Sequence, residues 1–112
     1  MNIARDVGLF GTGTRTNVLL ILALLGESHA SEIARILDAN ASNVSKAIDS
    51  LEQAGVVVGI AVGRTRRITI NPRYPYQADL TPLLQKMATT HPGLIQAVSE
   101  LRHRPRRTGK QL

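Results

Sequence analysis

Apolar residues dominate one long segment near the start of the chain. The longest apolar run, VLLILALL at residues 18–25, ends a stretch rich in Leu and Ala that begins at residue 14. Both residue types favour helix over strand, so we expect a helix over residues 14–25 that is apolar on every side from Val18 onward. Such a helix has to be covered on more than one face. In the preceding GLFGTG segment, Phe10 is expected to fill part of the core.

A short amphipathic helix is predicted next, within the segment HASEIARILDA at residues 29–39. Its apolar residues recur at helical spacing, and His29 or Ser31 can serve as the N-cap. Asn40 then lies at the N-cap position of a third helix, where its side-chain oxygen is expected to accept from the backbone N–H of Asn43. Gly55 is the expected end of this third helix.

The third helix, residues 41–54, has one apolar face and one face made of short polar residues. Ser and Asn each destabilise a helix by roughly 0.5 kcal/mol relative to Ala, so a merely solvated face would favour Glu, Lys, Gln or Arg. Short donors and acceptors suit a helix that approaches base edges in the major groove of DNA. Asp49 lies on this face, but we expect it to pair locally with Lys46 or Gln53. The residues expected to contact DNA are Ala41, Ser42, Asn43, Ser45, Lys46 and Ser50.

Two β-branched runs follow in VVVGIAVGRTRRITI, residues 56–70. They predict a β-hairpin that turns at Gly63, Arg64 and Thr65. Arg64, Arg66 and Arg67 gather at its tip, where they could either solubilise a sheet edge or contact DNA. Three arginines within four residues favour contact with phosphates or the minor groove.

Two more helices are predicted after the extended NPRYPY linker. Thr81 followed by Pro82, and His91 followed by Pro92, resemble caps with proline in the first turn, which predicts helices over residues 82–89 and 92–103. We expect three regions: a DNA-binding domain at 1–76, a helical dimerisation segment at 77–104, and a disordered basic tail at 105–112. The residues expected at the dimer contact are Leu20, Leu24, Leu94, Ile95, Val98 and Leu101.

The amino-acid composition limits the classes of partner that the chain is expected to bind. The 112 residues suffice for one domain, and the net charge of +6 favours an anionic partner such as nucleic acid or a membrane surface. Only three aromatic residues occur, too few for a platform that stacks single-stranded bases, so a duplex nucleic acid is the expected partner. DNA is favoured over RNA because the major groove of an A-form RNA duplex is too narrow for a helix to read. No apolar run approaches the roughly 20 residues of a membrane span, and no signal peptide is visible, so a soluble, cytoplasmic protein is expected.

Enzyme and metal chemistry are not indicated by the sequence. The chain has no cysteine, which excludes disulfides, thiolate metal sites and a cysteine nucleophile. His29, His91 and His103 lie far apart and lack helical pairing, so no metal site is expected. No nucleophile has a nearby base and no glycine-rich loop follows a strand, so we expect neither catalysis nor a cofactor.

Together the elements predict an α+β fold of the winged helix-turn-helix type: a three-helix core and a β-hairpin wing, with C-terminal helices. The stretch ASEIARILDANASNVSKAIDSLEQAGVV resembles the helix-turn-helix of ArsR-like and MarR-like regulators, in which ELA...L...S.VS..L..LE.AGLV is a common pattern. The resemblance extends over about residues 9–87 and includes small helix-turn-helix domains linked to nucleotidyltransferases. One departure is Asp38-Ala39, where the family often has a glycine in the turn. Metal-sensing relatives use Cys or paired His and carboxylate ligands, and nothing in this chain fits that pattern.

The resemblance implies a dimeric DNA-binding regulator. We therefore expect a homodimer that binds double-stranded DNA and regulates transcription, most simply as a repressor that occludes its site. The alternative is a protein-interaction module, such as an adaptor or antitoxin-like partner of a nucleotidyltransferase or another enzyme. The wing arginines and the serine-rich helix face favour DNA binding over this alternative.

Overall fold

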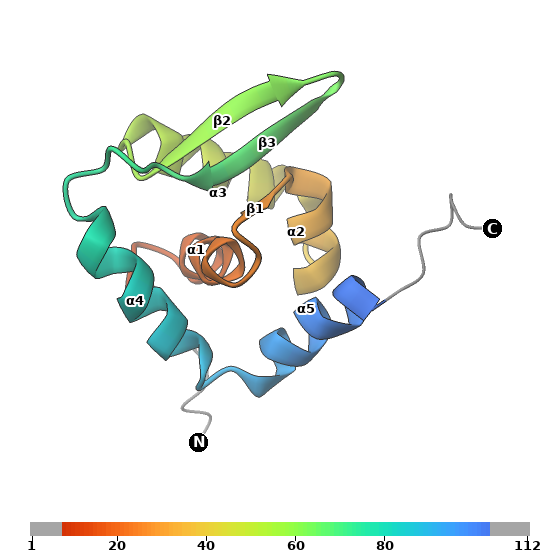
Figure 1. Ribbon diagram of the computed structural model, residues 1–112. Helices are drawn as coiled ribbons and strands as arrows, with labels where there is room; N and C mark the ends of the chain where they lie inside the picture. The colour runs from red at the N-terminus through yellow and green to blue at the C-terminus, as the bar shows by residue number, and fades with distance from the viewer. Residues whose placement is uncertain (1–7, 104–112) are drawn as a thin grey trace.

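The computed structural model describes residues 8–103, and the expected disordered tail at 105–112 lies outside them. Figure 1 shows α1 at the centre, seen along its axis, with the other elements arranged around it. The α+β fold class and the winged helix arrangement are confirmed. The elements are α1 (Gly13–Leu25), β1 (Glu27–Ser28), α2 (Ala30–Leu37), α3 (Ala41–Gln53), β2 (Val57–Val62), β3 (Thr65–Ile70), α4 (Gln77–Ala88) and α5 (Pro92–His103).

Helix α1 is the centre of the hydrophobic core. Its N-cap is Thr12, whose hydroxyl accepts a hydrogen bond from the N–H of Arg15 at 3.1 Å. The helix ends at Gly26, which adopts a φ of 89°, a backbone conformation that glycine reaches without strain. All residues from Val18 to Leu22 are buried. Because α3, α4, α5 and β3 all pack against α1, the cover that its apolar surface requires comes from the same chain.

Capping side chains mark the starts of both α2 and α3. His29 Nδ1 accepts from the N–H of Glu32 at 3.3 Å, and Asn40 Oδ1 accepts from the N–H groups of Ser42 at 2.8 Å and Asn43 at 3.3 Å. Both caps match the prediction. Asp38 between them adopts the left-handed conformation at φ 52°, the region that glycine usually occupies. The missing glycine therefore changes the residue in this turn but leaves the turn itself intact.

The sheet contains the predicted hairpin and one strand that the sequence did not predict. Its order is β1-β3-β2, and both pairings are antiparallel. The turn of the hairpin holds Gly63 and Arg64 only, because Thr65 already pairs with Val62. Strand β1 pairs Glu27 with Thr69, and its two residues are too few to give a period-2 pattern.

Helix α4 begins at Gln77, five residues before the predicted start at Pro82. Thr81 is not its cap, since it lies inside the helix. The physical reason is packing, because Leu80 and Leu84 are buried in the same core as α1. This burial stabilises helical turns on both sides of Pro82, whose ring is exposed to solvent. Helix α5 begins at Pro92 as predicted. None of the helices within residues 8–103 combines the length and hydropathy needed to cross a bilayer.

Candidate nucleic-acid interface

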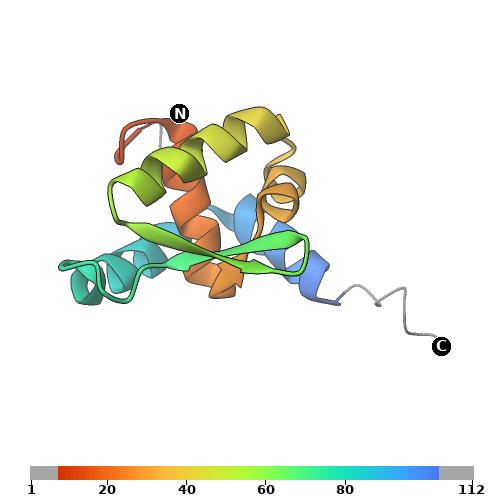
Figure 2. The ribbon, with the colours of Figure 1, turned by 90° about the horizontal axis from the view of Figure 1, so that it is seen from above.

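Helix α3 and the β2–β3 hairpin, here called the wing, lie on the same side of α1 (Figure 1). Figure 2 views the molecule from that side and shows both elements in front of α1. Val44, Ala47, Ile48 and Leu51 bury the inner face of α3. The polar residues expected to contact DNA thus lie off the core face: Ala41, Ser42, Asn43 and Lys46 are exposed, while Ser45 and Ser50 are half-buried.

Arg66 of the wing is tied to α3 by two carboxylates. Its Nη2 lies 3.2 Å from Asp49 Oδ1, and its Nη1 lies 3.3 Å from Glu52 Oε1. The second oxygen of Glu52 accepts the backbone N–H of Gly59 in β2 at 3.2 Å. The expectation that Asp49 pairs with Lys46 or Gln53 is therefore wrong, because a guanidinium distant in the sequence supplies the partner.

The three wing arginines, which the sequence treats alike, have different surroundings. Arg67 Nη1 lies 2.6 Å from Glu27 Oε2, so this side chain ties β3 to the α1–α2 connection. Arg64 lies in the turn, is exposed, and forms no ion pair with any residue between 8 and 103. Strand alternation sends Arg66 and Arg67 to opposite faces of the wing, which was the available sequence signal for their difference. Glu52 and Glu27, which pair with Arg66 and Arg67, were not singled out by the sequence pattern.

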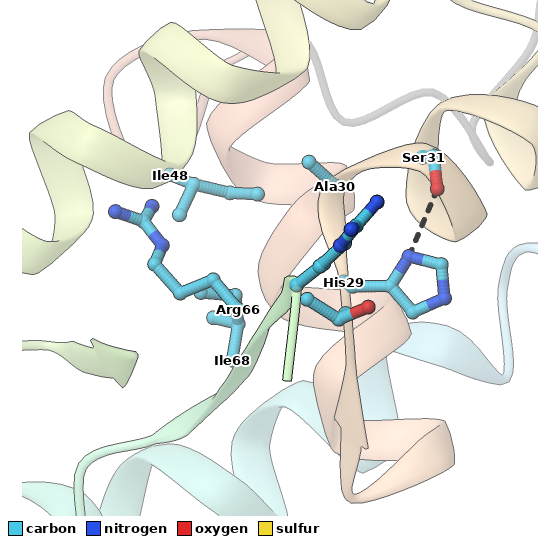
Figure 3. A pocket seen from close by; sticks show the side chains of 8 residues that line it. His29, Ala30, Ser31, Ile48, Arg66 and Ile68 are labelled. Carbon is cyan, nitrogen blue, oxygen red and sulfur yellow. Dashed lines mark hydrogen bonds between the residues drawn. The ribbon is translucent and has the colours of Figure 1, made fainter. Parts of the chain in front are cut away.

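A cleft of about 250 Å³ separates the wing from the start of α2 (Figure 3). His29 and Ser31 form one wall, and Arg66 extends from β3 toward α3 on the other side. The Ser31 hydroxyl lies 2.9 Å from His29 Nδ1. Because Nδ1 already accepts the Glu32 N–H, the hydroxyl is the donor in this contact. The cleft is lined by His29, Ala30, Ser31, Ile48, Arg64, Thr65, Arg66 and Ile68.

The residues expected at a dimer contact differ in how much of each side chain is exposed. Leu20 is completely buried in the core of its own chain, and Val98 is 6% exposed, so neither offers surface to a second copy. This removes both from the expected contact, because α4 and α5 cover α1 within one chain. Leu24, Leu94 and Leu101 are half-buried, whereas Ile95 on α5 is 39% exposed. Leu83 on α4, which the sequence reasoning did not select, is 46% exposed.

Metal-ligating side chains do not gather in the part of the chain that the structure describes. No group of three or more His, Asp or Glu residues there has the proximity to hold a metal ion. The carboxylates beside the wing pair with arginines instead, Asp49 and Glu52 with Arg66 and Glu27 with Arg67.

Residues 12–58, which run from the cap of α1 into β2, match the family model of the bacterial regulatory proteins of the arsR family. None of the curated proteins matches the chain.

Solved winged-helix structures share the fold. A double mutant of ZitR from Lactococcus lactis in its apo form has a TM-score of 0.57 and 21% identity, covering 81% of this chain and 66% of its own. The adhesin competence repressor AdcR from Streptococcus pyogenes has a TM-score of 0.55 and 21% identity, with 81% and 72% covered. YusO from Bacillus subtilis has a TM-score of 0.55 and 19% identity, with the same coverage as AdcR.

The chain spans slightly less than two thirds of the length of that ZitR chain. At these identities the structural likeness establishes the fold, while the family match covers the helix-turn-helix. The resemblance is thereby confirmed: the chain has a winged helix-turn-helix fold, and its residues 12–58 match the family model of the arsR bacterial regulatory proteins.

Proposed function

We propose that the protein binds double-stranded DNA sequence-specifically as a homodimer and represses transcription by occluding its site. The observation that carries the proposal is the outward face of α3, where short polar side chains stand clear of the core beside a basic wing. Major-groove base edges require donors and acceptors that can approach closely, and Ser42 and Asn43 meet that requirement. Lys46, one turn further along, can reach a guanine edge or a phosphate.

The wing contributes to this proposal through Arg64. Its guanidinium is exposed and forms no ion pair among residues 8–103, so it needs to break no contact in order to meet a phosphate. Arg67 can reach DNA only by leaving or sharing Glu27. Within the wing, Arg64 is therefore the first candidate for a phosphate contact.

The test of DNA reading starts with selection of bound duplexes from a random pool. Asn43→Ala should then lower the preference for the selected duplex by about 1 to 3 kcal/mol while binding to random duplex stays nearly constant. Gln85→Ala, an exposed polar truncation on α4, is the matched control and should change neither. If Asn43→Ala and Ser42→Ala both leave specific binding unchanged, α3 does not read the groove through this face.

The homodimer is proposed to form through the exposed apolar residues of α4 and α5. Leu83 on α4 and Ile95 on α5 are large apolar side chains exposed to solvent in the described chain. A two-fold axis through this surface would place two α3 helices on inverted half-sites about 10 base pairs apart, or a multiple of that spacing.

Sedimentation of the full chain tests this assembly. Ile95→Glu should dissociate the dimer, whereas Gln96→Glu adds the same charge at the next exposed position and should leave it intact. A monomeric wild-type chain that binds a single half-site with full affinity would exclude the dimer.

A further inference from the structure

The guanidinium of Arg66 joins three elements of the interface. Its two terminal nitrogens contact Asp49 and Glu52 at 3.2 and 3.3 Å, and these carboxylates stand one turn apart on α3. Glu52 in turn holds the N–H of Gly59 in the other wing strand. Glu52 of α3 therefore contacts both strands of the wing: β2 through the N–H of Gly59, and β3 through the guanidinium of Arg66.

The stem of Arg66 is also confined. A Cβ built on Gly59 would lie 3.1 Å from both Cγ and Cδ of Arg66, so the stem crosses directly over this glycine. Gly59 pairs with Ile68, whose side chain is buried and faces the same side of the hairpin. The packing below and the two carboxylates beside it direct the guanidinium toward α3, away from the tip of the wing.

The charge around Arg66 also argues against a phosphate contact there. One guanidinium against two carboxylates leaves a net charge of −1 at the junction of α3 and the wing, which disfavours a phosphate at this point. Arg64 lies in the turn directly before β3, and none of the carboxylates in residues 8–103 forms an ion pair that would neutralise its charge.

Building on the proposed DNA binding, we infer that Arg66 is a positioning residue, which fixes the wing against α3 through Asp49 and Glu52 and does not contact phosphate. The wing then follows the position of α3 in the groove, and Arg64 is carried to the backbone as a consequence. Loss of Arg66 should thus affect which sequences bind well more than the number of phosphates contacted.

The test compares Arg66→Gln with Arg64→Gln in the full chain, on the selected duplex and on a random duplex of equal length. Arg64→Gln should reduce the slope of log affinity against log salt by about 0.9, the value for one lost phosphate contact. Arg66→Gln should leave the slope unchanged and reduce the preference for the selected duplex by roughly 2- to 30-fold, the range for two exposed ion pairs. Arg66→Lys, which can meet one carboxylate, should recover part of that preference.

A double-mutant cycle identifies the route of the effect. Asp49→Asn combined with Glu52→Gln should reproduce the loss of preference, and adding Arg66→Gln to that pair should change nothing further. Additive losses would mean that Arg66 acts independently of α3, and a slope lowered by about one unit in Arg66→Gln would make it a phosphate contact. Either result overturns the inference.

Amide hydrogen exchange without DNA separates this inference from the proposed function. Wing amides from Val57 to Ile70 should exchange faster in Arg66→Gln and at the wild-type rate in Arg64→Gln. A protein that binds no duplex at all would end the proposed function, while the exchange rates would still decide whether Arg66 holds the wing. Unchanged exchange in Arg66→Gln would refute the tie itself.

Discussion

The N-cap of α3 offers a quantitative test of the helix-turn-helix. In Asn40→Ala, the N–H groups of Ser42 and Asn43 lose the Oδ1 acceptor that now lies 2.8 and 3.3 Å away. Asn40 is exposed, so water partly replaces the lost contacts and no cavity forms. Loss of such a cap destabilises a protein by about 0.5 to 2 kcal/mol, typically about 1 kcal/mol. For a domain of this size, about 1 kcal/mol lowers Tm by roughly 4 to 8 °C.

Urea unfolding followed by circular dichroism, in the absence of DNA, measures this change. The control is Asn40→Asp, which keeps an oxygen acceptor and places a negative charge at the helix N-terminus, so its stability should equal or exceed that of the wild type. Two results would refute the capping role: a free energy of unfolding unchanged in Asn40→Ala, or an equal loss in both variants.

Three further substitutions test the packing. Leu20→Ala should destabilise the chain by about 2 to 5 kcal/mol, equally at all protein concentrations, because Leu20 is buried within one chain; a concentration-dependent loss in urea unfolding would place it at an interface instead. Pro82→Ala should stabilise α4 by about 1 to 3 kcal/mol, since alanine restores a backbone donor inside the helix, and a lower Tm would contradict this. Gly59→Ala should destabilise by about 1 to 3 kcal/mol because its Cβ meets both Arg66 and the buried Ile68, an effect that thermal unfolding would register and that Arg66→Ala should relieve only in part.

The first three helices were predictable because their signals are local. The Asn40 cap, the terminal Gly55 and the apolar spacing all act within a few residues, and the structure places them as expected. The start of α4 was not predictable in this way. Thr81-Pro82 is a strong local start signal, but the burial of Leu80 against α1 depends on a contact that no local pattern contains.

The interface shows the same division between local and distant information. The outward face of α3 follows from helical periodicity alone. The pairing of Asp49 with Arg66 joins residues 17 positions apart, and it exists only once the wing has folded back along α3. Counting arginines at the hairpin tip therefore overstated the number of free cations there.

The central strand β3 has unequal support along its length. Ile68 and Thr69 hydrogen-bond within a sheet that has a strand on each side, whereas Thr65, Arg66 and Arg67 pair only with β2. Mechanically, the hairpin is a cantilever held at its root by β1 and held again, close to its end, by the contacts of Arg66 with α3. Bending should therefore be confined to the Gly63-Arg64 tip, so Arg64 can adjust to variations in the width of a DNA groove while the rest of the wing keeps its place beside α3.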